Sequence, residues 1–172
     1  TFHPVTLEDE TSLQQMGELL AALETLEDTH LIFTMPNADT DGRGLSAIVE
    51  RFVGDHPNAR AYTSLGHLRY LSCIKHVDGV VGNSSSGLTE APSFNKGTIN
   101  IGDRQQGRLK ATSVIDCDPD RQAITGALEQ LYSPAFQETV LTVVNPYGEG
   151  GACKKIVEVL LDHPLDSILK KS

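Results

Sequence analysis

The sequence predicts a domain of the α/β class, in which helices cover both faces of a parallel sheet. Short apolar runs typical of buried strands recur along the chain, and segments of about ten to fifteen residues with helical spacing separate them. The chain has 172 residues, of which 39% are hydrophobic, and this suffices for one domain with its own core. Together these observations predict a Rossmann-like three-layer sandwich, whose ligands lie beyond the carboxyl ends of the strands.

The first part of the chain predicts a strand end, a helix and a second strand. Thr1–Val5 has the pattern of the end of a buried strand, from which we expect that the chain was cut from a longer one. Apolar residues recur at helical spacing over Leu13–Leu26, behind an acidic segment that suits a helix start, and predict a helix of about five turns. His30–Met35 is apolar, is followed by Pro36 and predicts a buried strand.

Strands and helices continue to alternate over the rest of the chain. A long helix is predicted after Pro119, with that proline in its first turn, and an amphipathic helix is predicted over Cys153–Leu161. We expect the loops after Met35, Val81 and Ile101 to share one rim of the sheet. The other predicted elements are a helix over 45–52, a strand over 59–63, a short helix over 67–74, a strand over 79–81, a short helix after Gly87, and strands over 98–101 and 114–117.

Composition argues against several classes of partner and site. The formal net charge of −9 opposes binding to nucleic acid, which begins with positive potential, and no apolar run is long enough for a membrane span. The scattered cysteines, Cys73, Cys117 and Cys153, favour neither a disulfide framework nor a zinc site, and fit a reducing, cytoplasmic setting. The histidines show no ligand spacing, so we expect neither a metal nor a cofactor.

A Gly/Ser turn after the strand over 79–81 is the most informative stretch. Ser84, Ser85 and Ser86 stand between Gly82 and Gly87, where an apolar strand passes into a helix. Backbone N–H groups and up to three hydroxyls then point to one place, which suits a phosphate. The alternative is an ordinary strand-to-helix turn in which the serines cap the helix, since serine is a favoured cap.

Two further segments point to the same ligand. Glu90 lies a turn into the same helix, where its carboxylate can accept hydrogen bonds from a ribose diol, or can be a capping-box acid or a solvated charge. Arg104 and Arg108 lie in a Gly-bounded loop after the strand over 98–101, and their fork-shaped donors suit a diphosphate. Pairing of these arginines with Asp103 is the alternative. Because the two loops follow strands of one sheet, a shared anion site is favoured.

His3 and Asn37 complete the set of candidates. His3 stands at the carboxyl end of the first strand, where it can donate to a phosphate or protonate a departing one. A structural histidine that caps this strand is the alternative. Asn37 follows the strand over 30–35 and can hydrogen-bond a ligand or make an Asx turn.

These motifs resemble, in order and spacing, the carboxyl-terminal half of hydrolysing UDP-N-acetylglucosamine 2-epimerases. The resemblance covers the chain end to end, and rests on His-Pro-Val-Thr at 3–6, Gly-Asn-Ser-Ser-Ser-Gly at 82–87 with Glu-Ala-Pro at 90–92, Gly-Asp-Arg-Gln at 102–105, and Asn-Pro-Tyr-Gly at 145–148. In that family two Rossmann-like domains of the glycosyltransferase-B type close over a UDP-sugar. The resemblance implies that residues 1–172 are the carboxyl-terminal, UDP-binding domain and that the amino-terminal domain is absent from this chain.

The resemblance also implies a reaction and a set of contacts. His-Pro-Val-Thr marks the hydrolysing branch, in which UDP is eliminated from UDP-N-acetylglucosamine and water is added to give N-acetylmannosamine for sialic acid synthesis. A 2,4-diacetamido sugar nucleotide is a possible substrate in its place. Because the family's carboxylates for the C2 proton lie in the amino-terminal half, we expect this chain to bind UDP weakly without turnover. The implied UDP-binding residues are His3, Asn37, Ser84, Ser85, Ser86, Glu90 and Arg104, with His3 as a candidate catalytic residue.

Two other functions stay open at this point: half of a glycosyltransferase of the same architecture, and a non-catalytic UDP-sugar-binding module. The resemblance implies that residues 164–171 cross back toward the amino-terminal half. Apolar residues left without that half would favour homo-oligomers.

Overall fold

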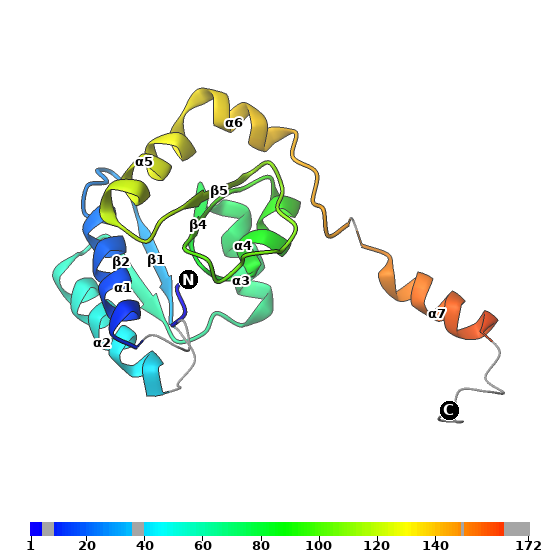
Figure 1. Cartoon of the computed structure of the whole chain (residues 1–172), viewed down its shortest axis with the longest axis horizontal. Coiled ribbons are helices and arrows are strands. Elements are labelled where there is room, and N and C mark those ends of the chain that lie inside the picture. Colours follow the sequence, from blue (N-terminus) through cyan, green and yellow to red (C-terminus); the bar gives the residue numbers. More distant parts are fainter. Residues whose placement is uncertain (5–8, 36–39, 149, 164–172) are drawn as a thin grey trace.

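Helices and parallel strands alternate along the chain as far as residue 101, and the last helix extends away from the other elements (Figure 1). The computed structural model describes residues 1–4, 9–35, 40–148 and 150–163. Its strands are β1 (Leu31–Thr34), β2 (Ala59–Tyr62), β3 (Gly79–Gly82), β4 (Gly97–Ile101) and β5 (Val114–Cys117). Its helices are α1 (Asp9–Leu23), α2 (Thr40–Asp55), α3 (Gly66–His76), α4 (Ser86–Thr89), the 3-10 helix η1 (Ala91–Phe94), α5 (Arg121–Tyr132), α6 (Pro134–Leu141) and α7 (Ala152–Asp162).

The strands form two parallel sheets, whereas the sequence predicts one. β1 pairs with β2, and β3, β4 and β5 pair in that order. Thr1 lies between the two sheets. Its nitrogen donates to the Val81 carbonyl (3.0 Å), its carbonyl accepts from the Asn83 N–H (3.2 Å), and its hydroxyl shares a hydrogen bond with that of Thr34. Residues 1–4 therefore contact both sheets without forming a regular strand, and Val5 lies outside the described residues.

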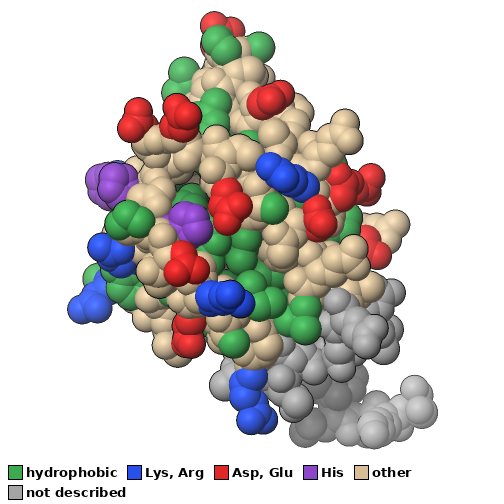
Figure 2. Space-filling view, turned by 90° about the vertical axis from the view of Figure 1, so that its left-hand side faces the viewer, with side chains coloured by type: hydrophobic (Ala, Val, Ile, Leu, Met, Phe, Trp, Pro, Cys, Tyr) green, Lys and Arg blue, Asp and Glu red, His purple; other side chains and the backbone are tan. Residues whose placement is uncertain are grey.

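A cavity of about 1170 Å³ lies between the two sheets, since residues of both β1 and β3 line it. Its lining includes Phe2, Leu19 and Leu23 near the chain start and Leu131 from α5. The space-filling view shows hydrophobic side chains in a hollow, with charged side chains around it (Figure 2).

The sheet centred on β4 carries the core that positions the site. All residues of β4 are buried. A Cβ on Gly97 would face Leu131 of α5, whereas the adjacent Thr98 donates from its hydroxyl to the Gly87 carbonyl of α4 (2.8 Å). Since neighbouring residues of a strand point to opposite faces, α5 and α4 cover the two faces of this sheet. The predicted arrangement of helices on both faces is therefore confirmed for β3–β5.

The long helix predicted after Pro119 is two helices in the structure. The Asp120 carboxylate caps α5 by accepting from the Ala123 N–H (2.9 Å), so Pro119 precedes the cap and does not lie in the first turn. Ser133 ends α5 and caps α6, which begins at Pro134. Proline breaks the helix here because it lacks an N–H and disfavours helical geometry in the residue before it.

α7 confirms the amphipathic helix predicted over Cys153–Leu161, but its apolar stripe is exposed. Ile156 is 57% and Leu160 is 62% exposed, and the helix projects away from the sheets (Figure 1). The predicted crossing segment at 164–171 lies outside the described residues. Within the described ranges, every helix is too short or too polar to cross a membrane.

Two glycine substitutions are predicted to shift stability in opposite directions. In Gly97→Ala the new methyl group overlaps Leu131 Cδ1 and lies 2.9 Å from Phe136 Cε1, so we expect a loss of about 1–3 kcal/mol in the free energy of unfolding. In Gly126→Ala on α5 nothing lies within 4 Å of the new methyl group, so we expect a gain of about 0.4–1 kcal/mol. Urea unfolding of both variants measures the difference, and equal effects would contradict the packing of α5 on β4.

Candidate functional site

β3 ends in a turn that requires glycine. Gly82 has a φ of +138°, and a Cβ at this position would overlap the Thr1 carbonyl oxygen. The chain then passes through Ser84 to Ser85, the N-cap of α4, whose side chain makes no capping bond. The N–H groups of Ser84 and Ser85 have no hydrogen-bond acceptor among the described residues. These two residues therefore offer N–H donors to a ligand. Ser85 makes no side-chain cap, whereas Ser84 Oγ accepts weakly from the Ser86 N–H (3.4 Å).

Asn83 attaches His3 to this turn. Its side chain is 1% exposed; Oδ1 accepts from the His3 N–H (2.7 Å) and Nδ2 donates to the His3 carbonyl (2.8 Å). These two hydrogen bonds fix the position of the His3 backbone, from which the imidazole extends. The sequence analysis assigned no role to Asn83, although a polar residue directly after a buried strand is a signal for one.

Arg104 reaches the same turn from the loop after β4. Its Nη1 donates to the Asn83 carbonyl (3.1 Å), and the buried Gln105 donates to the same oxygen (2.7 Å). Arg104 is exposed, so its other N–H groups remain available to a ligand. Within the described ranges, Asp103 pairs with neither arginine, and the Arg108 side chain makes no hydrogen bond or ion pair with the turn.

The loops after Val81 and Ile101 therefore share one rim, as the sequence predicts. The loop after Met35, which contains Asn37, lies outside the described residues.

The electrostatics around His3 favour an anion. Burial lowers the pKa of His3 below its usual range, and the guanidinium of Arg104 lowers it further. A bound anion would oppose the second effect and favour the protonated imidazole. Arg104 thus places a fixed positive charge near a histidine that an anion would help to charge.

Folding stability is predicted to depend on pH through His3. Because its pKa is lower in the folded chain, the unfolded chain binds more protons between that lowered value and about 6.5, and the free energy of unfolding rises with pH through this window. Urea unfolding from about pH 5 to about pH 8 measures the slope, which His3→Gln should reduce. The Thr1 amine, whose pKa burial lowers to about 6, adds a slope of the same sign to both proteins. An equal slope in the two proteins would contradict the placement of His3.

Ser86 supports Glu90 and does not present its hydroxyl to the rim. Ser86 Oγ donates to Glu90 Oε2 (2.5 Å) and accepts from the Tyr70 hydroxyl (2.7 Å). Glu90 follows α4 and begins η1, so it is not the acid of a capping box at the start of α4. Tyr70, on α3, was not among the residues that the sequence singled out, because no local pattern connects it to α4.

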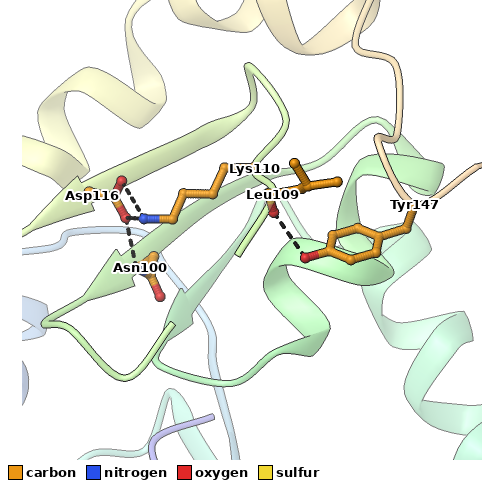
Figure 3. Close-up of polar contacts among 5 residues, drawn as sticks. All are labelled: Asn100, Leu109, Lys110, Asp116 and Tyr147. Atoms are coloured by element: carbon orange, nitrogen blue, oxygen red, sulfur yellow. Dashed lines mark hydrogen bonds and ion pairs between the residues drawn. The ribbon is translucent and has the colours of Figure 1, made fainter. Parts of the chain in front are cut away.

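The Asn-Pro-Tyr-Gly motif holds the far end of the arginine loop. The Tyr147 hydroxyl donates to the Leu109 carbonyl (3.1 Å), and the Lys110 ammonium contacts both Asp116 carboxylate oxygens at 2.8 Å (Figure 3). The buried Asn100 of β4 donates to the same carboxylate (2.7 Å). The arginine loop is therefore attached both to the sheet and to the segment that leads to α7.

The same motif contacts the end of α4. Asn145 donates from Nδ2 to the Thr89 carbonyl (2.9 Å) and to Ser93 Oγ (2.7 Å), and its Oδ1 accepts from the Tyr147 N–H (2.9 Å). Thr89 directly precedes Glu90. One short segment thus fixes the position of both the carboxylate and the arginine loop.

The structure brings most of the predicted residues together. Two chains of hydrogen bonds do this, one centred on Asn83 and one on Ser86. The residues so connected, directly or through neighbours in the turn, are His3, Ser84, Ser85, Ser86, Glu90 and Arg104.

The chain is similar in sequence to proteins of known family. A family model described as UDP-N-acetylglucosamine 2-epimerase matches residues 1–161. The chain is 37% identical over 174 residues to GDP/UDP-N,N'-diacetylbacillosamine 2-epimerase (hydrolyzing) of Campylobacter jejuni, covering 100% of this chain and 45% of that protein. It is 38% identical over 162 residues to polysialic acid biosynthesis protein P7 of Escherichia coli, covering 94% and 41%.

A solved structure supports the fold. The S. aureus MnaA-UDP co-structure has a TM-score of 0.73 with 19% identity, and covers 92% of this chain and 43% of that chain. This likeness confirms the Rossmann-like fold. The chain spans less than half the length of the curated relatives described above. The family match over most of the chain and the identity to these relatives show that this chain belongs to the UDP-N-acetylglucosamine 2-epimerase family.

Proposed function

We propose that this chain is the UDP-binding, carboxyl-terminal domain of a hydrolysing UDP-sugar 2-epimerase, and that residues 1–172 form that domain. The observation that carries the proposal is the meeting of Arg104 with the serine turn on the Asn83 carbonyl. The C. jejuni relative is named as a hydrolysing 2-epimerase, the E. coli relative is named as a polysialic acid biosynthesis protein, and the S. aureus MnaA structure is a complex with UDP.

The diphosphate is assigned to the serine turn and the arginine loop. The N–H groups and hydroxyls of Ser84 and Ser85 supply neutral donors, and Arg104 supplies a charged one. His3 lies next to Arg104 and donates to phosphate when protonated. Because these donors lie together on one rim, they can share the charge of a diphosphate, which carries more than one negative charge.

The nucleoside is assigned to the other side of the turn. Glu90 accepts hydrogen bonds from the ribose hydroxyls, and Asn37 lines the nucleotide side. Ser86, which the sequence places among the UDP contacts, acts by holding Glu90, because its proton is already donated to that carboxylate. No cofactor enters this assignment.

In the intact protein the reaction would convert UDP-N-acetylglucosamine and water to N-acetylmannosamine and UDP. The bond from the sugar to UDP breaks as the C2 proton leaves, and water then adds to the unsaturated sugar. Arg104, His3 and the serine turn stabilise the charge that develops on the departing diphosphate. The base for the C2 proton is expected in the amino-terminal domain, which would also complete the sugar pocket. The C. jejuni relative is named for an N,N'-diacetyl sugar, which supports a 2,4-diacetamido sugar nucleotide as the other candidate substrate.

A calorimetric titration tests this proposal. We expect the 172-residue chain to bind UDP saturably, and to bind uridine at least about tenfold more weakly, because uridine lacks the charge-assisted hydrogen bonds of the diphosphate. Incubation with UDP-N-acetylglucosamine should release no UDP at enzyme-like rates. Equal affinities for UDP and uridine would contradict the diphosphate site. Rapid UDP release would contradict the expectation that the amino-terminal domain supplies the base for the C2 proton.

A further inference from the structure

Three side chains, from α3, from α4 and from the junction between α4 and η1, form a continuous hydrogen-bonded chain. Tyr70 lies on α3, Ser86 begins α4 and Glu90 follows α4. The Tyr70 hydroxyl lies 2.7 Å from Ser86 Oγ, which lies 2.5 Å from Glu90 Oε2. All three residues are partly buried, so water competes less strongly for these bonds than at an exposed site.

The chemistry of the groups fixes the direction of this chain. An ionised carboxylate only accepts hydrogen bonds, so the Ser86 proton goes to Glu90. A serine hydroxyl has one proton, so Ser86 can then only accept from Tyr70, whose proton points to serine. Each bond polarises the next and strengthens it.

This direction has a consequence for Glu90. Its Oε2 is held from within the protein, whereas its Oε1 accepts no hydrogen bond from the described residues. One oxygen is thereby fixed and the other is presented with both lone pairs unused, which suits two neighbouring hydroxyl donors.

We propose that Tyr70 is a positioning residue that acts through Ser86 to orient Glu90 toward the ribose diol, so that the site selects nucleotides with this diol. The inference rests on the proposed UDP site and adds the residue that sets its preference for the sugar. Tyr70 touches no part of the ligand in this assignment.

The experiment compares UDP with 2′,3′-dideoxy-UDP, which keeps the base and the diphosphate and lacks the diol. The unmodified chain should bind UDP about tenfold or more tightly than the dideoxy compound. Tyr70→Phe should weaken UDP binding about three- to tenfold, the range that one hydrogen bond supports, and should leave the dideoxy affinity within about twofold. Tyr62→Phe is the matched control, since its hydroxyl makes no hydrogen bond among the described residues.

A double-mutant cycle tests whether Tyr70 acts through Ser86. Ser86→Ala should weaken UDP binding at least as much as Tyr70→Phe, and the double variant should lose no more than Ser86→Ala alone. If the losses of binding free energy in the two single variants add up in the double variant, Tyr70 acts independently of Ser86 and the proposal is overturned. Thermal unfolding of each variant is measured alongside, because a folding defect would weaken both ligands equally.

The outcomes separate this inference from the proposed function. If the unmodified chain binds neither ligand, the UDP site itself is wrong. If it binds UDP but Tyr70→Phe weakens both ligands to the same extent, or neither, the UDP site stands and the role of Tyr70 is overturned.

Discussion

Replacement of Arg104 by alanine is expected to weaken UDP binding by at least about tenfold. A hydrogen bond to a charged group contributes about 1.5–3 kcal/mol, and Arg104 is the cation that contacts the serine turn from its own exposed loop. The free energy of unfolding should change by less than about 1.5 kcal/mol, because the variant loses one partly exposed bond to the Asn83 carbonyl. Calorimetric titration with UDP and urea unfolding measure the two effects.

Arg108→Ala is the control for this prediction, because it removes the same charge from the same loop. The Arg108 side chain is exposed and makes no hydrogen bond or ion pair with the turn among the described residues, so UDP affinity should fall by less than about threefold. Arg104→Lys should restore only part of the affinity, since lysine lacks the planar fork of donors. Equal losses in Arg104→Ala and Arg108→Ala would show that net charge, and not position, governs binding.

Replacement of Asn83 by alanine is expected to damage both stability and binding. The substitution leaves the N–H and the carbonyl of the partly buried His3 without their partners, and an unsatisfied group that is fully buried costs about 1–3 kcal/mol. We expect the free energy of unfolding to fall by about 2–4 kcal/mol, and UDP affinity to fall because His3 is no longer held beside Arg104. Urea unfolding and titration of the refolded variant provide the two values.

Asn58→Ala provides the comparison for Asn83. Asn58 also uses its side-chain amide to hold a backbone carbonyl, that of Thr29 (2.7 Å), but it lies between α2 and β2, away from the rim. It should lose about 0.5–1.5 kcal/mol and keep its UDP affinity. An Asn83→Ala variant with unchanged stability and unchanged UDP affinity would contradict the role of Asn83 in holding His3 at the serine turn.

Much of the fold could be predicted because its strands and helices follow local patterns. The buried run over β4 and the helical spacing over α1 are visible in the sequence, and the order of elements follows from them. The break between α5 and α6 was missed, although Ser133 and Pro134 encode it, because apolar spacing continues across it. The division into two sheets could not be predicted, since it depends on which strands find partners in space.

The candidate site residues that could be predicted are mainly those that follow the carboxyl ends of strands. Ser84 and Arg104 were chosen as candidates because parallel strands place the loops that follow them on one rim, and Glu90 because it lies a turn into the helix after the serines. Tyr70 and Asn83 were not assigned roles, since their partners lie 16 and 80 positions away and no local pattern connects them. Gln105 was likewise missed: its side chain is 1% exposed, and a polar side chain in a loop is ordinarily expected to face water.

Chemical-shift mapping of the 15N-labelled chain during titration with UDP tests most directly where the diphosphate binds. We expect the backbone amides of Ser84 and Ser85 and the guanidinium N–H of Arg104 to shift together, with one saturation curve, and the amides of β1 and β2 to shift little. Saturable binding whose largest shifts fall on β1 and β2, with the serine turn unchanged, would contradict this prediction.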